Sequence, residues 1–175
     1  MKLHTILALG AAATAALVAT GASAADLLIN SPDSIYSSPL FNFEGFYIGA
    51  TGGGTISNSL YGNLGVVAGA NFAITDGIIA GVEFQGDTYW NGGGYAAYDA
   101  LALGRVGGFV SDNVLVTGDL GVGLLNGGAV SAFGGGAEMG LASNFGVRGD
   151  VQAISYFGHA PSALRASAGL IWHMD

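Results

Sequence analysis

Residues 147–151 read Val-Arg-Gly-Asp-Val, and an Arg-Gly-Asp tripeptide acts as an adhesion signal when a loop displays it. In a β-strand, however, Arg148 and Asp150 would lie on the same face, because side chains two residues apart share a face. A basic and an acidic side chain on one face of a strand can form an ion pair with each other, and they are then not displayed as an adhesion ligand. The surroundings of the tripeptide therefore decide its chemistry.

His159 and Ser162 are the residues best suited to catalysis, since an imidazole beside a hydroxyl can act as base and nucleophile. Pro161 stands between them in an expected loop, and no acidic residue nearby in the sequence would orient the imidazole. We therefore expect His159 to be a polar loop residue, and we expect no enzyme activity.

Glu83 and Asp87 share one face of an expected strand and are the best candidates for metal ligands. A metal site needs several converging ligands with an open path, and the arginines of the chain are better partners for these carboxylates. The glycine runs at 52–54, 92–94 and 134–136 lack the lysine that follows a phosphate-binding loop. We expect neither a metal nor a cofactor.

The composition restricts the class of protein. The chain has 175 residues, enough for one domain, and only 9% of them are charged, whereas glycine occupies 32 positions. The mean hydropathy is +0.53, yet after the N-terminus no apolar run reaches the roughly 20 residues of a membrane helix. A formal net charge of -8 argues against a nucleic-acid partner. The sequence contains no cysteine, which excludes disulfides and thiol chemistry.

The N-terminus has the pattern of a secretory signal peptide. Lys2 provides a positive start, residues 6–18 are apolar, and residues 22–24 form a small-residue cleavage motif. A retained membrane anchor is the alternative. Beyond the signal, prolines, serines and aspartates indicate a flexible leader. The expected parts are a cleaved signal peptide at residues 1–24, a leader at 25–42 and a β-barrel at 43–175.

Apolar and polar residues alternate along short segments after the leader, which is typical of β-strands with two different faces. In residues 78–87 every second side chain is apolar, and the intervening positions include Glu83 and Asp87. We expect eight such strands, at residues 44–54, 63–74, 78–87, 98–110, 114–123, 133–141, 147–153 and 164–172.

Short connections separate these strands. Tight polar turns are expected at residues 75–77, 111–113 and 143–144, and longer glycine-rich loops around residues 57, 93, 127 and 159. A β-chain in a membrane must pair every backbone N–H and C=O, so its sheet must close. The prediction is an all-β fold, an eight-stranded antiparallel transmembrane β-barrel of up-and-down topology. Eight strands enclose room for side chains only, which excludes a general diffusion porin.

The charged residues of the expected strands fall at inward positions. They are Glu83, Asp87, Arg105, Asp119, Glu138, Arg148, Asp150 and Arg165. Three arginines among five acids in a narrow lumen should form a hydrogen-bonded ion network, which then includes the Arg-Gly-Asp tripeptide. The alternation leaves one detail unexplained, since Leu101 and Leu103 share the parity of Arg105. In the alternative, a soluble sheet, these charges would face water and the opposite face would expose a broad apolar surface.

Aromatic residues gather near the expected strand ends, where a membrane barrel carries an aromatic girdle. The expected girdle consists of Trp90, Tyr95, Tyr98, Tyr156 and Trp172, with Tyr89 in the same cluster. We expect His173 to be a strand-end residue near the interface as well. Ordinary strand-forming residues without a girdle role are the alternative.

Four glycine-rich segments, in their order behind a signal peptide, resemble the small outer-membrane immunogenic proteins of Gram-negative bacteria, porin-like relatives of the OmpA-like transmembrane domain. These segments are FEGFYIGATGGG at 43–54, GRVGGFVSDNVLVTGDLGVG at 104–123, GGGAEMGLASNFGVRGDV at 134–151 and LRASAGLIW at 164–172. The resemblance implies an eight-stranded outer-membrane barrel with a structural or surface-antigen role and no catalysis. The chain departs from the family after Trp172, since the family ends on an aromatic residue.

We therefore expect a monomeric outer-membrane barrel of the cell envelope, exported through its signal peptide. Its expected partners are outer-membrane lipid, periplasmic chaperones and the barrel assembly machinery, and no nucleic acid. A narrow passive channel is one alternative, and a secreted lipocalin-like binding barrel is another.

Overall fold

The computed structural model of the protein describes residues 41–75 and 77–174. The predicted signal peptide, and all but the last two residues of the predicted leader, lie outside this part of the chain. The described residues form eight β-strands: β1 (Gly45–Ile56), β2 (Leu60–Thr75), β3 (Ile78–Asn91), β4 (Gly94–Ser111), β5 (Val114–Leu125), β6 (Gly128–Ala142), β7 (Phe145–Tyr156) and β8 (Ala163–Met174). No helix in the described ranges is long and apolar enough to cross a bilayer.

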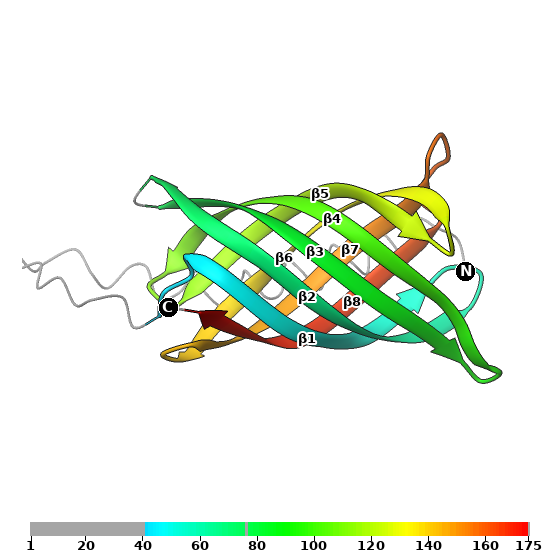
Figure 1. Ribbon diagram of the computed structural model, residues 1–175, viewed down its shortest axis with the longest axis horizontal. Coiled ribbons are helices and arrows are strands. Elements are labelled where there is room, and N and C mark those ends of the chain that lie inside the picture. The colour runs from blue at the N-terminus through cyan, green and yellow to red at the C-terminus, as the bar shows by residue number, and fades with distance from the viewer. Residues whose placement is uncertain (1–40, 76, 175) are drawn as a thin grey trace, which may run out of the picture. The chain divides into compact units, whose positions relative to one another are not determined.

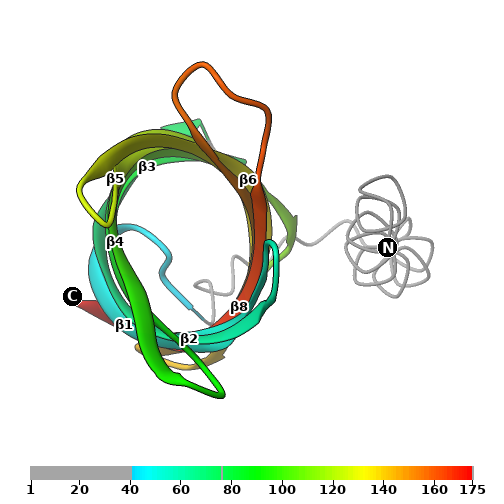
Figure 2. The ribbon, with the colours of Figure 1, turned by 90° about the vertical axis from the view of Figure 1, so that its right-hand side faces the viewer.

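The eight strands form one closed ring (Figures 1 and 2). Each strand pairs antiparallel with the next in the sequence, and β8 returns to pair with β1 from Phe46↔Met174 to Ile56↔Leu164. A closed ring has no free edge, so the strand backbones find hydrogen-bond partners on both sides. The predicted eight-stranded up-and-down barrel is confirmed.

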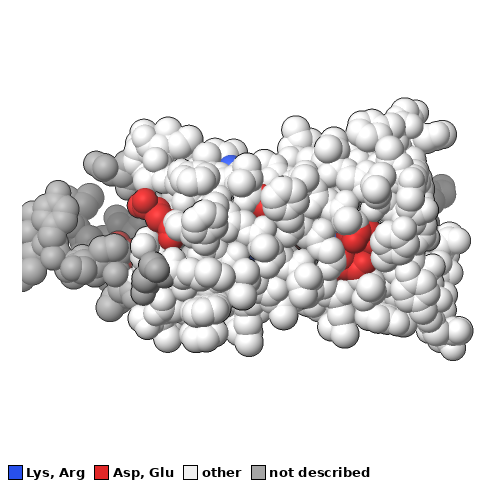
Figure 3. All heavy atoms as spheres, viewed as in Figure 1, with Lys and Arg blue, Asp and Glu red and all other residues white. Residues whose placement is uncertain are grey.

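Side chains alternate between the inside and the outside of the ring. In β3, Glu83 is 1% exposed and the next residue, Phe84, is 65% exposed. A register slip of one residue would therefore exchange charged and apolar side chains between the two surfaces. All eight strands contribute large apolar side chains to the outer wall. The face drawn in Figure 3 is mostly uncharged, with a few acidic atoms visible.

The strand connections define two ends of the barrel. The end at which β1 begins and β8 finishes also carries the short turns after β2, β4 and β6, and we call it the turn end. The opposite, loop end carries residues 57–59, 92–93, 126–127 and 157–162, and the last of these stands out sideways from the ring (Figure 2).

The sequence predicts that all four connections at the loop end are longer than the tight turns at the other end, and this prediction is wrong for two of the four. Residues 92–93 and 126–127 are two-residue hairpin loops, because their strands stay paired up to Asn91↔Gly94 and Leu125↔Gly128. Asn126 and Gly127 have φ angles of 49° and 81°, and an Asn-Gly pair with positive φ matches the turn that suits the twist of a hairpin.

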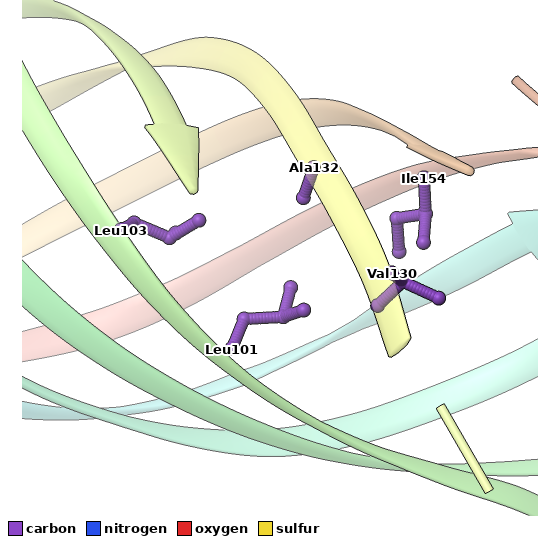
Figure 4. Close-up of a cluster of buried hydrophobic side chains, with 5 residues drawn as sticks. All are labelled: Leu101, Leu103, Val130, Ala132 and Ile154. Atoms are coloured by element: carbon purple, nitrogen blue, oxygen red, sulfur yellow. The ribbon is translucent and has the colours of Figure 1, made fainter. Parts of the chain in front are cut away.

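One side of the interior near the loop end is apolar. Leu101 and Leu103 of β4, Val130 and Ala132 of β6 and Ile154 of β7 point toward one another inside the ring (Figure 4). Each of them is 3% exposed or less. We call this cluster the loop-end cap, and it explains the parity of the two leucines, which point inward like Arg105 and pack against other inward apolar residues.

The turn end of the interior is filled by the chain that precedes β1. Phe41 and Phe43 are buried and pack against Ile79 and Leu115, two inward residues of β3 and β5. Figure 2 shows this start of the described chain crossing inside the ring. Gly45 has a φ of 93°, a left-handed conformation that glycine adopts without strain, and there the chain turns into β1. We call residues 41–43 the inserted segment.

Candidate functional site

Glu83 is the centre of a first ion cluster in the lumen. Its Oε2 accepts hydrogen bonds from Tyr47 Oη at 2.6 Å, Arg105 Nη1 at 3.0 Å and Arg148 Nη1 at 2.7 Å. Arg148 also donates through Nε to Asp150 Oδ2 at 2.9 Å. All five residues are 7% exposed or less. One carboxylate between two guanidinium groups gives strong, charge-assisted bonds, and we name these residues the Glu83 cluster.

Arg165 is the centre of a second cluster. Its Nη1 donates to Asp87 Oδ2 at 2.6 Å, to Asp99 Oδ2 at 3.0 Å and to Tyr89 Oη at 3.0 Å. Tyr89 in turn donates its hydroxyl to Asp99. A single guanidinium thus bonds to two acids from β3 and β4 that face each other in the Asp87↔Asp99 pair. We name these four residues the Arg165 cluster.

Two glutamines join the ion clusters to each other. Gln85 accepts from Arg165 Nη2 at 2.5 Å and donates to Glu83 Oε1 at 2.7 Å. Gln152 also accepts from Arg165 Nη2 and donates to Asp119 Oδ1 at 3.0 Å. A primary amide can do this because it carries both an acceptor and donors. The polar network is therefore continuous between the two clusters.

Glu138 and His173 form a separate pair close to the turn end. His173 Nε2 lies 2.6 Å from Glu138 Oε1, and Glu138 Oε2 lies 4.0 Å from Arg148 Nη1. His173 is a strand-end residue, as predicted, but its side chain is 1% exposed and lies inside the ring. β8 continues to Met174, so His173 keeps the inward parity of Arg165.

A glycine positions Tyr47 in the Glu83 cluster. Gly69 faces the Tyr47 ring from β2, and a Cβ there would lie 2.5 Å from Tyr47 Cζ and Oη and 2.6 Å from the Val82 carbonyl oxygen. Only a residue without a side chain lets the ring lie against the wall while its hydroxyl reaches Glu83. The glycine content of the strands thus makes room for large polar groups.

The structure places all eight residues of the predicted ion network inside the ring, each of them 7% exposed or less. The Arg148-Gly149-Asp150 tripeptide lies in β7. Arg148 and Asp150 bond to each other in the lumen, so the tripeptide is not displayed on the surface.

The predicted girdle residues lie at both ends of the barrel. The four near the loop end are Trp90, Tyr95, Tyr98 and Tyr156, of which Trp90 is half-buried and the others are exposed. Trp172, near the turn end, stacks on Phe145 with 6.5 Å between ring centroids. The inclusion of Tyr89 in this group is wrong, because Tyr89 is 4% exposed and belongs to the Arg165 cluster.

Several network residues were not predicted. Asp99 shares the inward parity of Arg105 in β4, which was a sufficient signal to find it. Tyr47 and Thr117 also contact Arg105, with bonds of 2.8 Å to Tyr47 Oη and 3.0 Å to Thr117 Oγ1. For uncharged polar side chains such as these, only the position at every second residue of a strand indicates that they point into the lumen.

The residues considered for catalysis lie apart from this network. His159 and Ser162 are exposed in the connection between β7 and β8. Among the described residues, no group of three or more His, Asp or Glu side chains is arranged to hold a metal ion.

The sequence matches no protein-family model and no curated protein. The structure is similar to a designed transmembrane β-barrel, with a TM-score of 0.52, 16% identity, and 75% of this chain and 97% of that chain covered. The chain has the fold of a transmembrane β-barrel.

Two further structures are similar to this barrel at lower scores. The attachment invasion locus protein Ail of Yersinia pestis, solved with the heparin analogue sucrose octasulfate, has a TM-score of 0.46 and 13% identity over 73% of this chain and 96% of that chain. The KdgM porin has a TM-score of 0.36 and 10% identity over 74% of this chain and 99% of that chain.

Proposed function

We propose that the chain is an outer-membrane barrel with a closed lumen, which serves the cell envelope as a structural or surface-exposed protein and transports nothing. The observation that carries this proposal is the filling of the lumen. Arg105, Arg148 and Arg165 extend into the interior, yet each is 5% exposed or less to a water-sized molecule. A water-filled channel along these side chains would leave them exposed.

The filling of both ends of the interior supports the same proposal. The inserted segment fills the turn end, and the Arg165 cluster and the loop-end cap lie side by side near the loop end. A conducting lumen needs a continuous polar and hydrated path. The inserted segment interrupts such a path at the turn end, which argues against the passive-channel alternative.

The outer wall supports a location in a bilayer. Leu64, Val66, Phe84 and Leu120 are each more than 60% exposed. A soluble lipocalin-like barrel would present such a surface to water, which favours aggregation. Together with the resemblance to small outer-membrane immunogenic proteins, this wall supports a Gram-negative outer membrane, reached through the assembly machinery, and a monomer surrounded by lipid. No enzyme activity is part of the proposal.

Planar-bilayer recording of the purified chain, with a porin as the positive control, tests the closed lumen. We expect no unitary conductance above the leak of the bilayer. Fractionation of the producing cells, with a heat-dependent shift of gel mobility as evidence of a folded barrel, tests the location. Stable ion conductance by the folded protein would reject the closed lumen, and recovery in the soluble fraction would reject the membrane role.

A further inference from the structure

The inserted segment encloses His173. The His173 ring lies 5.0 Å from the Phe41 ring and 5.9 Å from the Phe43 ring between centroids, both edge-on. The Tyr47 ring lies 5.4 Å away on β1. Edge-on packing of this kind is a favourable arrangement of aromatic rings. Two of the three rings around His173 therefore come from chain that precedes the first strand.

Specific contacts seat the inserted segment in the lumen. Asn71 Nδ2 of β2 donates to the Phe43 carbonyl oxygen at 2.9 Å. Gly140 leaves the space that Phe41 fills, since a Cβ at position 140 would lie 2.3 Å from Phe41 Cγ. The segment itself lies outside the strand ladders, whose pairing begins at Gly45. The ring of strands is thus complete without it.

Polar atoms beneath the segment oppose its insertion. Glu138 Oε2, Arg148 Nη2 and His173 Nδ1 are buried without a hydrogen-bond partner among the described residues. A buried polar atom without a partner is destabilising, and access of water relieves the penalty. The burial of two phenylalanines favours the inserted state, whereas the three atoms favour an open one.

We propose that residues 41–43 are a separable plug, which leaves the lumen as a unit while the eight-stranded ring stays closed. Its departure opens the turn end to water and exposes the His173–Glu138 pair. The ion clusters and the loop-end cap are formed by the strands and stay in place, so the lumen beyond the plug remains filled and an unplugged barrel still does not conduct. This inference goes beyond the proposed function, because it states that residues 41–43 close the turn end of the lumen and can leave it.

Acylation of histidine by diethyl pyrocarbonate tests the plug in the full-length protein reconstituted in liposomes. Peptide mass spectrometry separates the histidines, and exposed His159 is the internal reference. The plug is removed by Phe41→Ala/Phe43→Ala, and it is displaced with both rings retained by Gly140→Ala. Gly149→Ala is the matched control, because a Cβ there has no neighbour nearer than 3.9 Å.

We expect His173 to be protected in the parent chain and in Gly149→Ala. The rate of His173 acylation relative to His159 should rise at least about tenfold in both plug variants, as expected for a local opening. Heat-dependent gel mobility verifies that each variant is a folded barrel, and Gly140→Ala provides the test if the double variant does not fold. The inference is overturned if His173 reacts as fast as His159 in the parent, or stays protected in a folded plug variant. Conductance by the parent chain would instead contradict the closed lumen.

Discussion

Arg165 on β8 and Asp87 on β3 are joined across the lumen by a hydrogen bond of 2.6 Å, although 78 residues separate them in the sequence. β3 and β8 are not neighbours in the ring, so this bond connects separate parts of the wall. It can form only when the last strand has taken its place. The final strand thus carries the cation that pairs with acids of the third and fourth strands.

Arg165→Ala should destabilise the barrel strongly. The substitution leaves Asp87 and Asp99 buried without their cation, and breaking a buried ion pair from one side costs about 3–5 kcal/mol. Urea unfolding in liposomes, followed by tryptophan fluorescence, measures the loss. Asp112→Ala, in an exposed turn, is the control and should stay within about 0.5 kcal/mol of the parent. Equal midpoints for both variants would show that the acids do not depend on Arg165.

Glu83 and Arg148 should be energetically coupled. Arg148→Ala and Glu83→Gln each lower the unfolding temperature, because each leaves charged partners of the Glu83 cluster in the lumen unpaired. In a double-mutant cycle, we expect an interaction energy of about 0.5–3 kcal/mol, the range for residues in one hydrogen-bonded network. Effects that simply add would contradict the direct bond of 2.7 Å between them.

Gly69→Ala should disrupt the Glu83 cluster without removing any of its members. The new methyl group would collide with the Tyr47 ring and the Val82 carbonyl, and overpacking of this kind costs about 1–3 kcal/mol. Gly149→Ala adds the same methyl group where the nearest atom is 3.9 Å away and should be nearly neutral. Chemical unfolding of both variants under the same conditions measures the difference, and a neutral Gly69→Ala would refute the close packing.

Leu101→Ala should weaken the loop-end cap. The leucine is 2% exposed, and truncating a buried leucine costs about 2–5 kcal/mol, depending on how far the surroundings collapse. Leu120→Ala removes the same atoms from a side chain that is 67% exposed on the outer wall, so its cost should be smaller. Unfolding midpoints in liposomes compare the two, and the reverse order would contradict the placement of the cap.

Nitroxide labels should report opposite environments at adjacent positions. The chain has no cysteine, so a single introduced cysteine carries each label unambiguously. A label at Val82, which is 52% exposed on the outer wall, should collide with oxygen in the bilayer and not with a water-soluble nickel complex. A label at Glu83 should be protected from both. Contact of the Val82 label with the nickel complex would place that wall in water.

The barrel was predictable from the sequence because one physical rule, two different surroundings on the two faces of each strand, repeats in every segment. Arg148 and Asp150 were placed correctly by this rule alone. The same rule applied to β4 also places Asp99 inside, two positions before Leu101. Leu101 and Leu103 made the inward position of Asp99 hard to recognise, because two apolar residues at inward positions contradict the alternation of apolar and polar faces. Their apolar partners on β6 and β7 become known only from the structure.

Other features had no comparable signal. Phe41 and Phe43 precede the first strand, so no periodicity predicts that the chain turns back into the lumen there. Tyr89, by contrast, shares the parity of Glu83 and Asp87, so the alternation of β3 places it inside, and only its aromatic ring near a strand end suggests a girdle. The register between β3 and β4 shifts between Tyr89 and Trp90, a local irregularity that sequence patterns do not reveal.

The burial of the arginines also determines which kinds of molecule the outer surface of the barrel can bind. Lys2 lies outside the described residues, and the three arginines are all buried. The described exterior therefore offers no lysine or arginine side chain to a sulfated glycan or a phosphorylated lipid headgroup. Attachment of this wall to a neighbour must depend on contact between uncharged surfaces, and should change little when salt is added.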